Sequence, residues 1–236
     1  MSFRKFFPSV GRVLTGVAAM VAVAGIANCA SFSGRNTLGG IIEAPSLTRA
    51  HATLDEILLG ANGTYIDRVL ADRDSTIERW PDHLVQPLRV WIDSTPLLSG
   101  LQADYPGAVR AAFDQWQFTG IGLRVIYVNQ PDDADVRVHW TDHLSHKTGS
   151  TTWRTDHAGW ITSSDITLAT HISDGQLLDE RGMHAIALHE VGHALGLSHS
   201  QDPRDIMAPL VRVDGLSASD RSTIKLLYSL PAGHVG

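Results

Sequence analysis

The sequence predicts an α/β fold in which a layer of strands is covered by helices. Three observations carry this prediction. A strand-like alternation at residues 88–93 is followed by an amphipathic helical pattern at 104–117. Further strand patterns lie between residues 123 and 170, and a second helical pattern follows at 179–196. With 236 residues, 43% of them hydrophobic, the chain can bury one core as a single domain.

The N-terminus has the pattern of an export signal. Arg4, Lys5 and Arg12 precede an apolar stretch at residues 13–27 that consists largely of Val and Ala. This stretch is short for a bilayer span, which needs roughly 20 residues. A buried core helix is the alternative, but such a helix would show a polar face and this stretch shows none. We therefore expect residues 1–28 to be a signal peptide and the protein to be exported.

Cys29 ends the apolar stretch in the sequence "IANC". This motif resembles the lipobox of bacterial lipoproteins and makes Cys29 a candidate lipid attachment site. The resemblance implies a lipid anchor that ties an envelope protein to the membrane, and simple secretion is the alternative. A single cysteine cannot form an internal disulfide. Residues 29–46 contain many Gly, Ser, Thr and Asn residues and are expected to be a flexible tether.

Residues 47–86 are expected to form an N-terminal extension that could serve as a pro-region. A short helical pattern lies around residues 52–59, and a polar connection follows it. Two prolines in "RWPDHLVQP" then mark a boundary. The main domain is therefore expected to span residues 87–236.

The main domain begins with the half-buried strand "LRVWID" at residues 88–93. The following helix has Pro106 near its start, glycines beyond its end, and one apolar stripe formed by Val109, Ala112, Phe113 and Trp116. Four more strands are expected at residues 123–128, 134–140, 150–155 and 165–170. A long polar segment separates the second of these strands from the third.

The second helical pattern contains "HEVGHALGLSH", residues 189–199. His189 and His193 are four residues apart, so they lie on the same side of a helix and can reach one ion. Glu190 follows the first histidine directly. Its carboxylate is therefore expected beside the ion, where it can hold a water molecule that the ion also holds.

The third histidine of this run needs a change of chain direction. A straight helix would carry His199 about 9 Å beyond His193. Gly196 tolerates the positive φ that ends a helix, so the chain can turn back and bring in a third imidazole. Three neutral nitrogens leave one position of a tetrahedral zinc ion open, which is typical of catalytic sites and not of structural ones.

The chemistry expected of this arrangement is peptide hydrolysis. Zinc lowers the pKa of a bound water molecule to about 7. Glu190 would take the proton of this water as a general base and return it to the departing amine. A helix whose histidines only pack in the core or face solvent is the alternative, but chance seldom produces the complete spacing.

The motif H-E-x-x-H-x-x-G-x-x-H resembles that of the metzincin metallopeptidases, and "SHSQDPRDIMAP" is similar to the following stretch of the matrixin branch. The resemblance assigns His199 as the third ligand and places Met207 in the Met-turn beneath the metal. Pro209 stands where other metzincin branches carry a tyrosine. The stretch "LSASDRSTIKLLY" is similar to the C-terminal helix of matrixins.

This resemblance implies a zinc endopeptidase with the metzincin fold. That fold has a twisted, mainly parallel five-stranded sheet on two long helices, and a small C-terminal subdomain with the Met-turn and a final helix. A peptide or protein substrate would lie extended along an edge strand at residues 149–154. Residues 208–216 would form the wall of the pocket beside the zinc.

Further metal ions are a separate question. Four other histidines are available, but their spacing does not follow the matrixin pattern for a second, structural zinc, which is not expected here: His143, His146, His157 and His171. Five aspartates could supply oxygen ligands to calcium, although solvated loop acids are the alternative: Asp132, Asp133, Asp135, Asp156 and Asp165.

Charge argues against a nucleic-acid partner, because 25 acidic residues outnumber 19 basic ones and no basic run lies beyond the N-terminus. Two other functions stay open beside the zinc endopeptidase. One is a zinc-binding envelope lipoprotein that cleaves nothing. The other is a zinc hydrolase that acts on cell-wall peptides.

Overall fold

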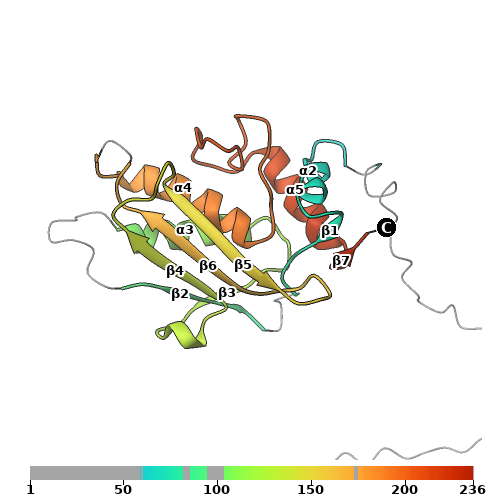
Figure 1. The fold of residues 1–236 in the computed structure, drawn as a ribbon, viewed down its shortest axis with the longest axis horizontal. Helices are drawn as coiled ribbons and strands as arrows, with labels where there is room; N and C mark the ends of the chain where they lie inside the picture. Colours follow the sequence, from blue (N-terminus) through green and yellow to red (C-terminus); the bar gives the residue numbers. More distant parts are fainter. Residues whose placement is uncertain (1–58, 60, 82–85, 95–103, 173–174, 236) are drawn as a thin grey trace, which may run out of the picture. The chain divides into compact units, whose positions relative to one another are not determined.

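A five-stranded sheet forms the centre of the described part of the chain (Figure 1). The computed structural model describes residues 59, 61–81, 86–94, 104–172 and 175–235, all within one unit spanning residues 48–236. The expected signal peptide, Cys29, the tether and nearly all of the helix expected at 52–59 lie outside these residues. Within the described ranges, no helix is long and apolar enough to cross a membrane.

The order of the strands in the sheet is β3-β2-β4-β6-β5. The first four strands in this order run parallel to one another, whereas β5 is antiparallel to β6 and lies at the edge. The mainly parallel five-stranded sheet and the edge position of residues 149–154 are therefore confirmed. The strands are β2 (Leu88–Ile92), β3 (Val125–Tyr127), β4 (Val136–Thr141), β5 (Gly149–Thr155) and β6 (Ile161–Ala169).

The strand expected at residues 165–170 is longer than predicted, because β6 begins at Ile161. The polar run at residues 162–165 concealed this start. Ser164 is fully buried within it, but its hydroxyl donates to the Thr152 carbonyl at 3.0 Å, so its polarity is satisfied inside the sheet.

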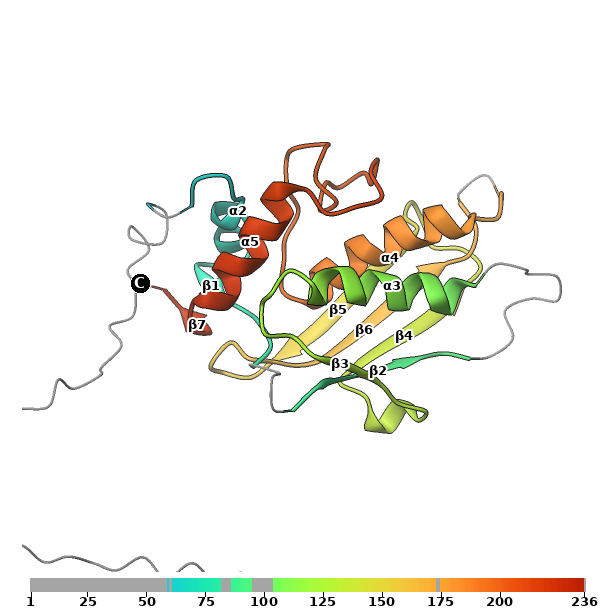
Figure 2. The ribbon, with the colours of Figure 1, turned by 180° about the vertical axis from the view of Figure 1, so that it is seen from behind.

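Two long helices cover one face of the sheet, α3 (Tyr105–Gln117) and α4 (Glu180–Ala194) (Figure 2). α3 begins at Asp104, whose side chain accepts a hydrogen bond from the Gly107 amide. Its predicted apolar stripe is buried, and Trp116 donates from Nε1 to the Leu188 carbonyl of α4 at 2.9 Å. A short 3₁₀ helix, η1 (Pro131–Asp133), precedes β4.

The C-terminal part contains α5 (Ala218–Ser229) and packs against residues from before the sheet. α2 (Ile66–Ala71) lies beside α5, where the Tyr65 hydroxyl donates to Asp220 Oδ1 at 3.0 Å. β1 (Thr76–Ile77) pairs antiparallel with β7 (Gly233–His234). Residues 61–80 therefore contribute to the same core as the sheet, and their fully or nearly fully buried side chains are Tyr65, Ile66, Val69, Leu70, Ile77 and Trp80.

Candidate metal centre

The last turns of α4 carry His189, Glu190 and His193. Helix α4 is buried on most of its surface because α3, the sheet and the C-terminal part surround it. Gly192 lies between the two histidines, and a Cβ atom there would be 2.3 Å from Met207 Sδ. The missing side chain therefore allows Met207, which is fully buried, to pack directly against the ligand-bearing turn.

Helix α4 ends in a chain reversal at Gly196, where φ is +102°. The Leu197 amide donates to the Gly192 carbonyl at 3.0 Å, and the Gly196 amide donates to the His193 carbonyl at 2.9 Å. This pair of bonds is the Schellman motif. The reversal brings the His199 ring to a centroid distance of 4.7 Å from His193 and 5.3 Å from His189.

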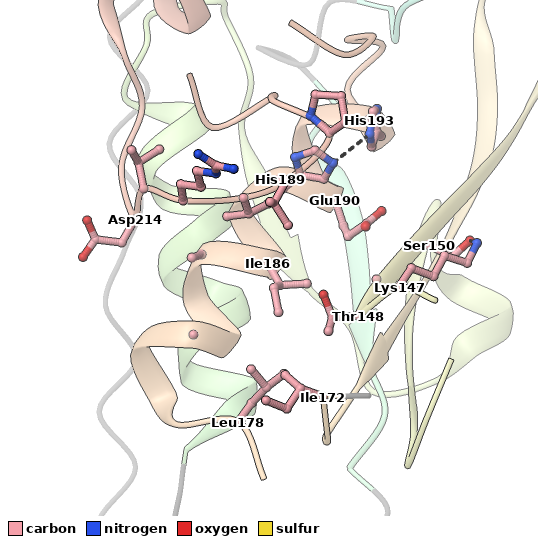
Figure 3. Close-up of a pocket in the computed structure, with 18 of the residues that line it drawn as sticks. Lys147, Thr148, Ser150, Ile172, Leu178, Ile186, His189, Glu190, His193 and Asp214 are labelled. Atoms are coloured by element: carbon pink, nitrogen blue, oxygen red, sulfur yellow. Dashed lines mark hydrogen bonds between the residues drawn. The ribbon is translucent and has the colours of Figure 1, made fainter. Parts of the chain in front are cut away.

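The three imidazoles converge on one point. Nε2 of His193 lies 3.1 Å from Nε2 of His189 (Figure 3). Nε2 of His193 also lies 3.2 Å from Nε2 of His199. Nδ1 of His189 is 2.7 Å from the Ile206 carbonyl, and Nδ1 of His193 is 2.9 Å from the Leu197 carbonyl. A carbonyl can only accept, so both Nδ1 atoms carry the proton and both Nε2 atoms present a lone pair.

This donor set fits zinc. Lone pairs that face one another at about 3 Å repel unless a cation lies between them, and neutral imidazole nitrogens are common zinc ligands. Among the described residues, the three histidines are the one group of three or more His, Cys, Asp or Glu side chains that could hold a metal ion.

The electrostatics of the site also suit a metal. Burial lowers the pKa of His193 to about 3, with a further contribution from His189. Burial likewise lowers the pKa of His189 and of His199. All three rings are therefore neutral near pH 7, which is the state that binds a metal. Burial raises the pKa of Glu190 to about 7, and a hydrogen bond from Thr151 and the charge of Lys147 oppose this rise.

Glu190 lies between the imidazoles and the edge strand β5 (Figure 3). Thr151 Oγ1 lies 2.6 Å from Glu190 Oε2 and 3.0 Å from the Glu190 carbonyl oxygen. A Cβ atom at Gly149 would be 2.3 Å from Glu190 Oε1, so only glycine leaves room for the carboxylate. Residues 149–154 were expected only as the substrate-binding edge strand; the contacts of Gly149 and Thr151 with Glu190 have no signal in the sequence, because only the packing of β5 on α4 creates them.

The turn that contains Met207 is held by a buried carboxylate. The Ile206 carbonyl accepts the bond from His189, and the Ile206 amide donates to Asp220 Oδ2 at 2.9 Å. Asp220 also forms the capping box of α5 with Ser217. The Ser200 amide donates to the Met207 carbonyl at 2.9 Å, which joins the turn to the residue after His199.

A cavity of about 1040 Å³ opens beside the three histidines. One wall comes from the stretch predicted for this role, residues 208–216, of which Pro209 to Asp214 line the cavity. α4 contributes Ala185 and Ile186, and residues 146–151 form the side at β5. The Arg181 side chain pairs with Asp214 at 2.6 Å on the exposed rim. The cavity is thus lined both by apolar side chains, such as Ile186 and Val211, and by polar groups, which include Glu190 and the three histidines.

Among the described residues, the other histidines and acids considered as metal ligands form no group that could hold a metal ion. His143 and His171 have ring centroids 5.1 Å apart, whereas His146 lines the cavity. Three of the five aspartates have protein partners: Asp135 pairs with Arg89, Asp165 with Arg137 and His139, and Asp156 accepts from the Ala158 and Trp160 amides.

Comparison with known proteins points to one family. A family model described as Matrixin matches residues 91–229. A macrophage metalloelastase of Oryctolagus cuniculus is 36% identical over 74 residues, which cover 28% of this chain and 16% of that protein. Metalloendoproteinase 1 of Glycine max is 36% identical over 75 residues, which cover 30% and 23%. Matrix metalloproteinase-15 of Homo sapiens is 43% identical over 61 residues, which cover 24% and 9%. The matches therefore span less than a quarter of each of these relatives.

Proposed function

The chain belongs to the matrixin family, and we propose that it is a zinc-dependent endopeptidase. The observation that carries this proposal is the convergence of three neutral imidazoles, their ligand nitrogens all within 4.8 Å of one another, beside a buried carboxylate. The names of the relatives support the same activity.

His189, His193 and His199 would hold the zinc ion, which supplies a Lewis acid that activates water and polarises the scissile carbonyl. Glu190 would act as general base toward the attacking water and then pass the proton to the leaving amine. Thr151 holds one carboxylate oxygen of Glu190, which leaves the other oxygen for this proton transfer. Burial favours the neutral acid and so makes the release and uptake of one proton near pH 7 easier.

The substrate would be an extended peptide added to the sheet at β5. This strand has β6 on one side only, so its other edge can pair with a further strand. The cavity next to the histidines begins at the same residues, 146–151. A side chain of the bound peptide could therefore enter this cavity while the backbone passes the metal centre.

The general base is tested by replacing Glu190 with alanine. We expect cleavage of an unstructured protein to fall by about 100-fold or more, because proton transfer is lost. Zinc content, measured by atomic absorption, should stay near one ion per chain, since Glu190 is not a ligand. Glu180→Ala, at the exposed start of the same helix, is the matched control and should cleave normally. Unchanged turnover in Glu190→Ala would remove the mechanism.

The same assay separates the other two functions. A digest of purified peptidoglycan, run beside the unstructured protein, tests for a hydrolase of cell-wall peptides. A zinc-loaded chain that cuts neither material would instead be a binding module.

We also propose that the protein is exported and that Cys29 carries a lipid. The support is the basic start, the apolar stretch at 13–27 and the "IANC" motif. Mass spectrometry of the mature N-terminus tests both points, because it reports the cleavage position and the mass of any attached lipid. A mature chain that starts elsewhere without lipid would contradict the anchor.

A further inference from the structure

Residues 61–80 run beneath the end of α4, on the side where the chain reverses toward His199. After α2 the backbone turns sharply at Asp74 and Ser75, with φ of +48° and +57°. Two consecutive residues other than glycine in the left-handed region are unfavourable and persist only where the surroundings hold them. This turn places Arg73 and Glu78 against the chain reversal.

Arg73 is the main contact between this segment and the reversal. Its side chain is 6% exposed, and Nη1 donates to the Gly196 carbonyl at 2.6 Å and to the Glu78 carbonyl at 3.3 Å. Nε lies 3.5 Å from Glu78 Oε2. The remaining nitrogen, Nη2, has no hydrogen-bond partner among the described residues. The guanidinium is thus buried at a cost that its bonds to Glu78 and Gly196 must offset.

The fit at Gly196 is tight. A Cβ atom on Gly196 would be 2.3 Å from the Glu78 carbonyl oxygen, so the two backbones touch. Trp80 donates from Nε1 to the Ala194 carbonyl at 2.8 Å. The last carbonyls of a helix lack partners within the helix and favour a nearby positive charge. Arg73 and Trp80 donate hydrogen bonds to carbonyls at this end of α4, and Arg73 also supplies the positive charge.

Arg73 and Glu78 also contact β5, the edge strand along which the substrate is proposed to bind. Glu78 Oε2 accepts a hydrogen bond from Trp153 Nε1 of β5 at 2.8 Å, and the Arg73 guanidinium lies 4.9 Å from the centroid of the Trp153 ring. Arg73 and Glu78 therefore connect the chain reversal to the edge strand, two parts that the proposed reaction requires in one arrangement.

We propose that Arg73, held by Glu78, is a positioning residue that fixes the reversal at Gly196 and thereby the third metal ligand, His199. It follows that residues 61–80 are a working part of the active enzyme and are not released with a pro-region. This inference rests on the proposed function only in the identity of the metal ligands.

The test is Arg73→Met in the full chain, measured as the zinc dissociation constant by competition with a chromogenic chelator. We expect the constant to rise about 10- to 100-fold, as for other residues that orient metal ligands. With Co²⁺ in place of zinc, the visible absorption bands should shift toward those of His199→Ala, in which the third ligand is missing. Loss of fold stability alone would not produce this shift.

Arg204→Met is the matched control, because it likewise replaces one arginine with methionine, here at an exposed position shortly after the third ligand. Its side chain is 86% exposed and pairs with Asp202, and we expect zinc affinity and the cobalt spectrum to stay unchanged. A folded Arg73→Met chain with the zinc affinity and cobalt spectrum of the unmodified protein would overturn the inference.

If Arg73→Met does not fold, Arg73→Lys decides the matter. A lysine can donate to the Gly196 carbonyl but lacks the planar guanidinium that also holds Glu78. We therefore expect a zinc affinity between that of the unmodified chain and that of His199→Ala. Affinity equal to that of the unmodified chain would contradict the role of the guanidinium. Neither readout depends on cleavage. An inactive wild-type chain whose Arg73 variants lose zinc would refute the endopeptidase and leave this inference standing.

Discussion

Among the described residues, the hydroxyl of Thr151 is the one side-chain donor to the Glu190 carboxylate. Its single proton lies between two oxygens of Glu190, and the carboxylate oxygen, at 2.6 Å, is closer than the backbone carbonyl, at 3.0 Å. This bond favours the ionised carboxylate and opposes the effect of burial on the pKa of Glu190. Thr151 thereby orients the proposed base and limits the rise of its pKa.

Replacing Thr151 with valine should lower kcat with little change in KM. Valine keeps the shape of threonine, so the loss isolates one hydrogen bond to a charged group, of about 1.5 to 3 kcal/mol. A fall in kcat of about 10-fold or more is therefore expected in steady-state kinetics on an unstructured peptide. Thr151→Ser should restore most of the rate. Wild-type kcat in the valine variant would show that the bond has no part in catalysis.

At the scale of elements, α5 supports the metal centre from a distance. Asp220, in the first turn of α5, accepts hydrogen bonds from the Ile206 amide and the Ser217 amide through Oδ2 and from the Tyr65 hydroxyl through Oδ1. The Ile206 peptide group passes this support on, because its carbonyl accepts from His189. The first turn of α5 thus holds the Met-turn, the start of α2 and His189 in fixed positions relative to one another.

Asp220→Ala should destabilise the fold by about 3 kcal/mol, because two backbone amides and the Tyr65 hydroxyl would lose their buried acceptor. Tyr65→Phe removes only one of the three bonds and should cost about 1 kcal/mol. The free energy of unfolding from urea titration measures both changes. Equal losses in the two variants would mean that Asp220 does not hold the turn before Met207.

At the scale of the whole molecule, burial of the three histidines lowers the stability of the metal-free fold in acid. An unfolded chain binds protons on its histidines below about pH 6.5. In the fold, burial lowers the pKa of all three ligand histidines, to about 3 for His193. The unfolded state therefore binds more protons in acid, and the stability of the metal-free fold falls as pH decreases from about 6.5. Glu190 acts in the opposite sense, because its raised pKa favours the metal-free fold in acid.

Removal of zinc with a chelator should accordingly lower the melting temperature, since zinc binds the folded state by mass action. The melting temperature of the metal-free chain should be lower at pH 5.5 than at pH 7.5, because three histidines outweigh one glutamate. Differential scanning calorimetry measures both effects. Metal-free His193→Gln is the control and should lose less stability over this pH interval. An equal loss in the two chains would contradict the assigned role of His193.

Several features follow from the sequence because they depend on neighbours along the chain. His189 and His193 share a helix face by their spacing, and Gly196 permits the reversal that His199 needs. The fold class was predicted correctly because strand and helix periodicities are local. The start of β6 was missed for the opposite reason, since Ser164 is polar and becomes acceptable only through its bond to β5.

The tertiary structure alone decided what surrounds the motif. Thr151 and Glu190 are in contact although they are 39 residues apart in the sequence, and Arg73 and Gly196 are in contact although they are 123 residues apart. No local pattern reports such contacts, because they depend on how separately formed elements pack on one another. From the sequence by itself came the layered fold and the proposed metal ligands and general base, whose signals are short-range. The partners that hold them came only from packing, because those partners lie far apart in the chain.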